Sequence, residues 1–169
     1  MEIVIRKALP EEAYEYTSCH ISCWQSAYRG IVPDEFLDNM PAEIARRTER
    51  FRQLLSEPDF DSYCVMYGDR MIGLLTFGKN RDEDKPYSGE IGGMYLVGEF
   101  WDKGYGGKMM DFAKNELKRM GYDEVSLWVL EENARARRFY ERHGFVFDGA
   151  KKEIHIGKPL IEIRYSLAL

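Results

Sequence analysis

The sequence is poor in cysteine and histidine. Its 169 residues include three cysteines, Cys19, Cys23 and Cys64, and none of them forms a Cys-x-x-Cys pair. An odd number of cysteines without paired spacing does not suggest a disulfide framework. Of the three histidines only His20 lies beside Cys19 and Cys23, which is too few ligands for a zinc site. We therefore expect no bound metal and interpret the cysteines as buried thiols.

The chain also lacks long apolar runs. No stretch approaches the roughly 18 apolar residues of a membrane-spanning helix. The first residues, M-E-I-V-I-R, indicate a strand and show none of the features of a signal peptide. We therefore predict a cytoplasmic protein with no membrane partner.

An excess of basic residues is absent as well. Lysine and arginine total 24 against 29 acidic residues, which gives a formal net charge of -5. This charge argues against non-specific nucleic-acid binding, which needs a basic face, and weakly favours a cationic small partner. Any anionic cofactor would have to be held by local features, because the overall field of the protein would repel it.

Internal repeats, low-complexity tracts and Pro/Gly/Ser-rich linkers are also missing, so we predict a single domain over residues 1–169. Apolar periodicity and turn residues predict an α/β fold with the order β-α-α-β-β-β-α-β-α-β-β, a mixed sheet with helices on its faces. The predicted strands are Ile3–Lys7, Tyr63–Tyr67, Met71–Lys79, Glu90–Val97 and Val125–Leu130. Two closing strands are predicted with approximate bounds, Phe145–Lys151 and Leu160–Leu167. The predicted helices run from Pro10 to about Tyr28, from Asp34 to about Met40, from Pro41 to about Leu55, from Lys108 to about Met120, and over Asn133–His143. Asp34 is the predicted capping residue of the second, short helix.

The most informative segment is 90–107, which reads E-I-G-G-M-Y-L-V-G-E-F-W-D-K-G-Y-G-G. A strand-like run leads into a glycine loop that opens directly into a helix. Glycines let a phosphate approach the unpaired N–H groups of a helix start, so the pattern predicts a diphosphate site. A dinucleotide-binding loop is excluded because Met109 stands where its third glycine belongs, and no Gly-Lys-Ser/Thr completes a P-loop.

A second motif lies in segment 133–145, which reads N-A-R-A-R-R-F-Y-E-R-H-G-F. Together with the loop W-D-K-G-Y-G at 101–106, it resembles the GNAT superfamily of N-acetyltransferases. The family helix pattern Asn-x-x-Ala-x-x-Phe-Tyr-x-x-x-Gly-Phe is matched at every diagnostic position. Two positions depart from the family: Trp101 replaces the usual Gln or Arg, and Gly98 replaces a frequent proline.

The resemblance implies a site for acetyl-CoA where the Glu90–Val97 and Val125–Leu130 strands splay apart. Backbone groups of the first strand would pair with the pantetheine arm, and the glycine loop would wrap the pyrophosphate. Asn133 would bond the pantetheine arm, cap its own helix, or do both. The implied cofactor-binding residues are Met94, Tyr95, Leu96, Asp102, Lys103, Gly104, Tyr105, Gly106, Gly107, Lys108 and Asn133.

Two residues are candidates for the chemistry. In the family the tyrosine matching Tyr140 points its hydroxyl at the thioester sulfur, where it would act as general acid toward the leaving thiolate. The alternative for Tyr140 is an aromatic side chain in the core. An amine with a pKa near ~10 must lose a proton before it attacks, and Glu90 is the candidate base, directly or through a water. Glu90 could instead sit exposed at a strand end or only attract a cationic acceptor.

The acceptor side is less specified by the sequence. Trp24 and Tyr28, at the end of the first long helix, are candidates for the wall of an acceptor pocket, with core packing as the alternative. We predict an N-acetyltransferase that acts by direct attack on a primary amine of a small molecule. The alternatives are a peptide or protein amine as acceptor, and a non-catalytic acyl-CoA-binding module. The resemblance also allows a homodimer, although no residue identifies its contact surface.

Overall fold

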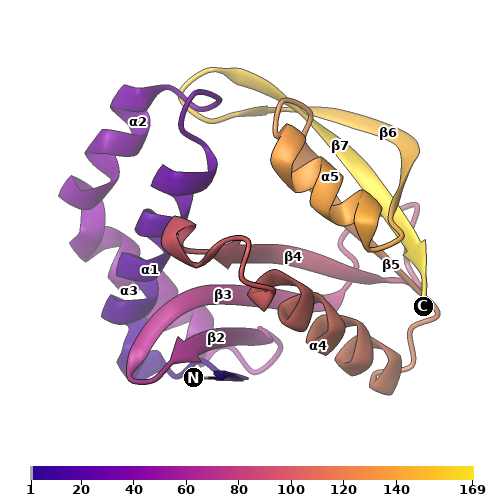
Figure 1. Ribbon diagram of the computed structural model, residues 1–169, viewed down its shortest axis with the longest axis horizontal. Coiled ribbons are helices and arrows are strands. Elements are labelled where there is room, and N and C mark those ends of the chain that lie inside the picture. Colours follow the sequence, from indigo (N-terminus) through magenta and orange to yellow (C-terminus); the bar gives the residue numbers. More distant parts are fainter. Residues whose placement is uncertain (1) are drawn as a thin grey trace.

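The computed structural model describes residues 2–169 and contains seven strands in one sheet (Figure 1). The strands are β1 (Ile3–Lys7), β2 (Ser62–Tyr67), β3 (Arg70–Lys79), β4 (Gly89–Leu96), β5 (Glu124–Leu130), β6 (Val146–His155) and β7 (Pro159–Ala168). The helices are α1 (Ala13–Ala27), α2 (Asp34–Asn39), α3 (Ile44–Ser56), α4 (Tyr105–Arg119) and α5 (Ala134–Arg142), with short 3-10 turns at Pro10–Glu12, Met40–Glu43 and Gly98–Phe100. The predicted α/β class is confirmed.

Two details of the predicted helices differ. Asp34 is the first residue of α2 and not its cap, since Pro33 occupies the cap position and no side chain caps this helix. Pro41 is the second residue of the 3-10 turn Met40–Glu43, and α3 itself starts only at Ile44. A proline suits a first turn because it needs no N–H partner there. The short helix predicted from Asp34 to about Met40 is present as α2.

The sheet order is β1-β2-β3-β4-β5-β7-β6, and β4 and β5 form its one parallel pair among the described residues. These two strands pair at only two positions, Gly89 with Val125 and Glu90 with Ser126. On its other side β4 follows β3 as far as Leu96, which pairs with Gly73. Beyond Glu90, therefore, β4 and β5 diverge, as the family resemblance led us to expect, and the backbone of β4 that faces β5 has no strand partner.

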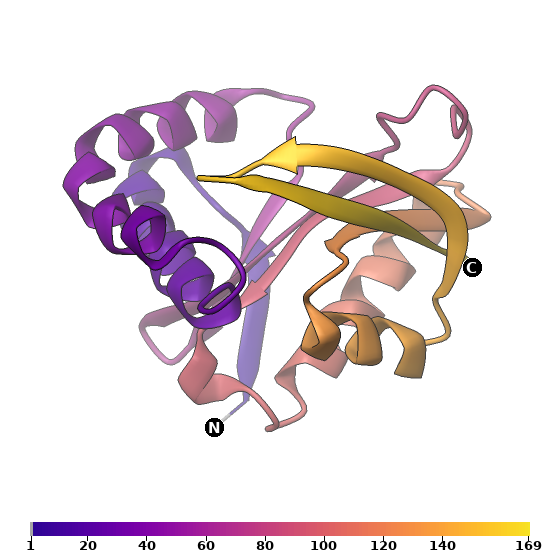
Figure 2. The same cartoon turned by 90° about the horizontal axis from the view of Figure 1, so that it is seen from above.

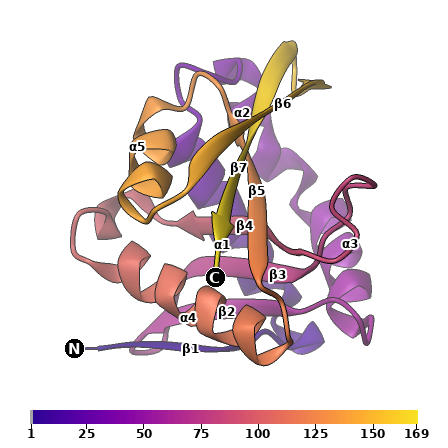
Figure 3. The ribbon, with the colours of Figure 1, turned by 90° about the vertical axis from the view of Figure 1, so that its right-hand side faces the viewer.

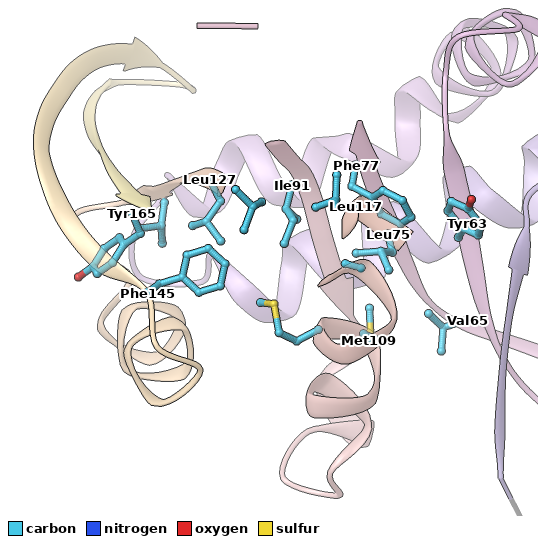
Figure 4. Close-up of a cluster of buried hydrophobic side chains, with 14 of the residues drawn as sticks. Tyr63, Val65, Leu75, Phe77, Ile91, Met109, Leu117, Leu127, Phe145 and Tyr165 are labelled. Carbon is cyan, nitrogen blue, oxygen red and sulfur yellow. The ribbon is translucent and has the colours of Figure 1, made fainter. Parts of the chain in front are cut away.

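Helices cover both faces of the sheet. The N-terminal helices α1, α2 and α3 gather on one side, and α4 and α5 lie on the other (Figures 2 and 3). The main core lies between the sheet and α4, where Met109 and Leu117 pack against Leu75, Ile91 and Leu127 (Figure 4). On the opposite face α1 packs against β2 and β3 and, with α2, against the ends of β5 and β7. The two helical layers therefore meet the diverging strands from opposite sides.

Gly73 shows how tightly β3 and β4 approach each other. A Cβ atom built on Gly73 would lie 2.6 Å from the backbone oxygen of Tyr95, whereas one on Gly78, in the same strand, would meet nothing within 4 Å. Backbone cannot move aside as a side chain can, so we expect Gly73→Ala to destabilise the protein by about 1–3 kcal/mol. Gly78→Ala should be neutral or slightly stabilising. Urea unfolding of both variants checks this, and equal midpoints would contradict the packing argument.

Candidate functional site

A cavity of about 610 Å³ occupies the opening between β4 and β5. It reaches from the loop before α4, past α5, to the β6–β7 hairpin and the end of α1. This volume suits a small organic ligand. The predicted residues that line it are Tyr28, Glu90, Met94, Tyr95, Leu96, Asp102, Gly104, Gly106, Gly107, Asn133 and Tyr140.

One end of the cavity is formed by the glycine loop and the first turn of α4. Gly104 is the N-cap of α4 with φ +81°, a conformation that favours glycine, and no side chain caps this helix. Its first amide groups are therefore free to donate to a ligand. A Cβ on Gly106 would lie 3.1 Å from the ring of Phe139, so the glycine lets α4 approach α5 closely. This arrangement can hold an anion such as a diphosphate.

Three predicted cofactor-binding residues of this loop do not line the cavity. Lys103 lies over the ring of Phe100, with Nζ 5.2 Å from its centroid. Tyr105 packs against Tyr67 and Phe100, and Lys108 lies 4.0 Å from Glu2. Their assignment remains a prediction, and in this structure any contribution of Tyr105 would come from its backbone.

The family mismatch at Trp101 has a structural role. Its indole N–H donates to the carbonyl oxygen of Leu96 at 2.7 Å, which ties the loop to the end of β4. The guanidinium of Arg135 lies 4.4 Å from the centroid of the Trp101 ring. Arg135 also donates to both carboxylate oxygens of Asp102, at 2.8 and 2.7 Å. Trp101 therefore links the loop, β4 and α5 in place of a polar side chain.

Asn133 caps α5, since its side-chain oxygen accepts a hydrogen bond from the backbone N–H of Ala136 at 3.2 Å. It lines the cavity as well, so the capping role leaves its amide N–H₂ group available to a ligand. The arginine side chains of α5 point in different directions. Arg138 and Arg142 face the cavity, whereas Arg137 donates to the hydroxyl of Tyr165 at 3.1 Å and to the carbonyl of Glu131 at 3.0 Å.

Tyr140, on α5, lines the cavity. Its ring packs near Phe139 and Phe145, with centroids 5.5 and 5.9 Å apart. Burial, and to a smaller degree the nearby Tyr95 hydroxyl, raises the pKa of Tyr140. The phenol therefore keeps its proton at neutral pH and can donate it. Core packing of the ring and a hydroxyl directed at a ligand are compatible roles.

Glu90 lies at the point where β4 and β5 separate, and its side chain is only 5% exposed. It accepts hydrogen bonds from the Arg81 backbone N–H at 3.1 Å, from Nε at 3.0 Å and from Nη2 at 2.8 Å. Sequence reasoning did not identify Arg81, which belongs to a polar loop without a motif. The guanidinium therefore engages both carboxylate oxygens, which fixes the orientation of the Glu90 side chain.

The wall formed by the end of α1 holds Tyr28 and, behind it, Trp24. Tyr28 lines the cavity, and burial raises its pKa well above the usual value. The Trp24 ring lies 5.0 Å from that of Tyr28 and 5.2 Å from that of His20, and it packs on the apolar cluster around Leu130. In this structure Trp24 supports the wall without lining the cavity.

Further side chains line the other end of the cavity and were missed from the sequence. They are Trp128 on β5, Lys152 on β6 and Glu162 on β7. Lys152 lies over the indole of Trp128 at 4.0 Å and 3.6 Å from the Glu162 carboxylate. Only strand register brings them together, since Trp128 pairs with Arg164 while Glu162 pairs with Lys152 and Leu130. No local motif marks such a set.

Two negative observations apply to residues 2–169. No group of at least three His, Cys, Asp or Glu side chains has a metal-binding arrangement there. Over the same range, no helix combines the length and the apolar character that crossing a bilayer requires.

Comparison with known proteins gives concordant results. The model of the acetyltransferase (GNAT) family matches residues 22–145. A protein of Mycobacterium tuberculosis named as a probable N-acetyltransferase is 27% identical over 87% of this chain and 82% of its own. An uncharacterized N-acetyltransferase of Bacillus subtilis is 23% identical over 93% of both chains. Among solved structures, the PaiA N-acetyltransferase of Thermoplasma acidophilum in complex with coenzyme A has a TM-score of 0.78 at 20% identity and covers both chains fully.

Proposed function

Because this chain belongs to the acetyltransferase (GNAT) family, we propose that it transfers the acetyl group of acetyl-CoA to a primary amine of a small molecule. One observation carries the proposal. A single cavity joins an uncapped helix start to a half-buried tyrosine and to acidic side chains at its other end. A diphosphate, a thioester and an amine need these three environments in this order. The T. acidophilum relative, which has the same fold, binds coenzyme A, which supports the proposal.

The cavity divides into parts for the two substrates. Gly104, Gly106 and the N–H groups that begin α4 would hold the pyrophosphate, with Arg138 and Arg142 nearby as cations. The free backbone of Met94, Tyr95 and Leu96 would pair with the pantetheine amides, since β5 has diverged from these residues. One of those groups, the Leu96 carbonyl, already accepts the indole N–H of Trp101 and keeps one lone pair for the ligand.

The proposed chemistry is direct attack of the amine nitrogen on the thioester carbonyl carbon. As the C–S bond breaks, the Tyr140 hydroxyl gives its proton to the leaving thiolate. Glu90 is the base predicted from the sequence, and its carboxylate is bound by Arg81 through both oxygens. Cys64 is an unsuitable nucleophile for an acyl-enzyme, because burial raises the pKa of its thiol to about 11 and it does not line the cavity.

Binding and turnover are tested in one preparation. We expect 1 mM coenzyme A to stabilise the protein by roughly 4 kcal/mol if its Kd is near ~1 μM. Free-thiol release from acetyl-CoA is then measured with spermidine, L-lysine, an aminoglycoside and a peptide N-terminus as acceptors. Stabilisation with thiol release supports the proposal. Stabilisation without release from any amine indicates a binding module, and no stabilisation contradicts a coenzyme A site.

A further inference from the structure

The acceptor end of the cavity contains a second carboxylate, Glu162, whose surroundings differ from those of Glu90. Glu162 lies on β7 between Leu130 of β5 and Lys152 of β6. Side chains alternate along a strand, so Glu162 shares a face with Leu160, which packs in the cluster formed with α1 and α2. This is the face opposite α4 and α5. Glu162 therefore enters the cavity from the side on which Tyr28 lies.

The two carboxylates differ in how they are held. Glu90 accepts three hydrogen bonds from Arg81, the shortest at 2.8 Å. Within residues 2–169 the carboxylate of Glu162 accepts no hydrogen bond, and its one ion-pair partner, Lys152, is 3.6 Å away. Lys152 also lies over Trp128, so it can leave Glu162 without losing all its contacts. Glu162 is thus an acidic group of this cavity with oxygens free for a ligand.

The electrostatic surroundings of Glu162 favour uptake of a proton. Burial raises the pKa of Glu162, and the nearby Glu90 on β4 raises it further, while Lys152 on β6 and Arg81 on the loop after β3 oppose this change. Tyr28, which lines the same cavity, keeps its proton. A carboxylate with a raised pKa is the better base near neutral pH, because transfer of a proton to it from the ammonium group costs less free energy.

We propose that Glu162 is the general base that deprotonates the acceptor amine. The inference rests on the proposed acetyl transfer. The ammonium group of the acceptor gives one proton to a Glu162 oxygen, and the resulting amine nitrogen bonds to the acetyl carbon while the C–S bond breaks. The thiolate receives the Tyr140 proton, and the tyrosine regains one from the nitrogen that becomes the amide. Glu162 finally releases its proton to solvent, so the reaction yields amide, thiol and one proton.

In this arrangement the Glu90–Arg81 pair has another task. The ion pair stays intact and fixes the start of the 80–88 loop beside the point where β4 and β5 separate. Glu90 is then a positioning residue, whereas Glu162 contacts the acceptor. The two assignments differ in their pH behaviour, which makes them separable.

The test compares Glu162→Gln, Glu90→Gln and Glu153→Gln in thiol-release assays from pH 5.5 to 9.5, with the best amine of spermidine, L-lysine, an aminoglycoside and a peptide N-terminus. Glu153 is exposed on β6 outside the cavity and serves as the matched control. We expect Glu162→Gln to lower kcat/KM about 10²-fold at pH 7. The loss should shrink below about tenfold by pH 9.5, because more of the amine is then already unprotonated. Glu162→Asp keeps a carboxylate and should retain the wild-type acidic limb at a reduced rate.

The outcomes separate this inference from the proposed function. If Glu162→Gln matches the wild type across the pH range, or if Glu90→Gln alone shows the pH-dependent loss, Glu162 is not the base while acetyl transfer stands. If the wild type acetylates none of the amines, the Glu162 assignment falls together with the proposed acceptor class. Stabilisation by coenzyme A, measured on every variant, verifies that each one folds and binds the cosubstrate.

Discussion

Replacing Tyr140 by phenylalanine is expected to lower kcat by about 10²-fold while leaving KM for acetyl-CoA within a small factor. General acid catalysis typically contributes 10²–10⁴-fold, and the substitution removes the donor alone. The ring of Tyr140 packs against Phe139 and Phe145, and phenylalanine keeps these contacts. The fold and the cosubstrate site should therefore persist in the variant, so the loss reports on proton transfer.

The control for this experiment is Tyr122→Phe. Tyr122 packs on the same main core but does not line the cavity, so this variant loses a hydroxyl without losing a donor to the thiolate. Steady-state thiol release and stabilisation by coenzyme A are measured on both variants. A Tyr140→Phe enzyme with wild-type kcat would show that the thiolate leaves unassisted. A large rise in KM with unchanged kcat would instead indicate that the hydroxyl only binds the cosubstrate.

The part of the cavity proposed for the cosubstrate could be recognised in the sequence because its residues are contiguous. The strand β4, the loop and α4 form one segment whose glycines and apolar period can be recognised locally. Asn133 and Tyr140 lie seven residues apart on one helix, so their relative positions follow from helical geometry. The mismatch at Trp101 could not be interpreted, because its partners Leu96 and Arg135 are known only from the fold.

The end of the cavity proposed for the acceptor could not be predicted in the same way. Arg81, Lys152 and Glu162 belong to a loop and to two late strands, and each is an ordinary polar residue in its local context. They meet only because β7 inserts between β5 and β6. A shift of one residue in that pairing would turn Glu162 to the other face. Glu90 was named from the sequence as the candidate base, but its engagement with Arg81 was not predicted, since nothing local indicates that the loop folds back onto β4.

Replacing Arg164 by methionine is expected to cost about 3 kcal/mol of stability and to loosen the acceptor end. The Arg164 side chain is only 7% exposed. It donates to Asp148 at 2.7 Å, to Asp82 at 3.0 Å and to Asp84 at 2.7 and 2.8 Å, and it lies near the Trp128 ring. It therefore joins β7, β6 and the 80–88 loop. Asp82 and Asp148 are less than a fifth exposed, and removing the buried cation that they share leaves their charges uncompensated, which destabilises the fold.

The pH dependence of this loss has a definite sign. The pKa of Asp148 is lowered: burial alone would raise it, but hydrogen bonds from Ala150, Ser166 and Arg164 outweigh burial. The hydrogen bond from Arg164 also lowers the pKa of Asp84. A depressed folded-state pKa contributes stability above the unfolded value near ~3.9, and the contribution disappears as pH falls through the folded value. Without Arg164 these carboxylates should protonate more readily, so the deficit should be larger at pH 7 than at pH 4.5.

The matched control is Arg70→Met, which removes a guanidinium from an exposed pair with Glu99, where both side chains are more than half exposed. Exposed ion pairs contribute about 0–1 kcal/mol, so this variant should melt close to the wild type, whereas Arg164→Met should lose roughly 6–12 °C. Thermal melts at pH 7 and 4.5 provide the comparison. Equal melting temperatures for the two variants would mean that water compensates the charges of the surrounding aspartates when Arg164 is absent. The 80–88 loop would then need another anchor to hold Arg81 against Glu90.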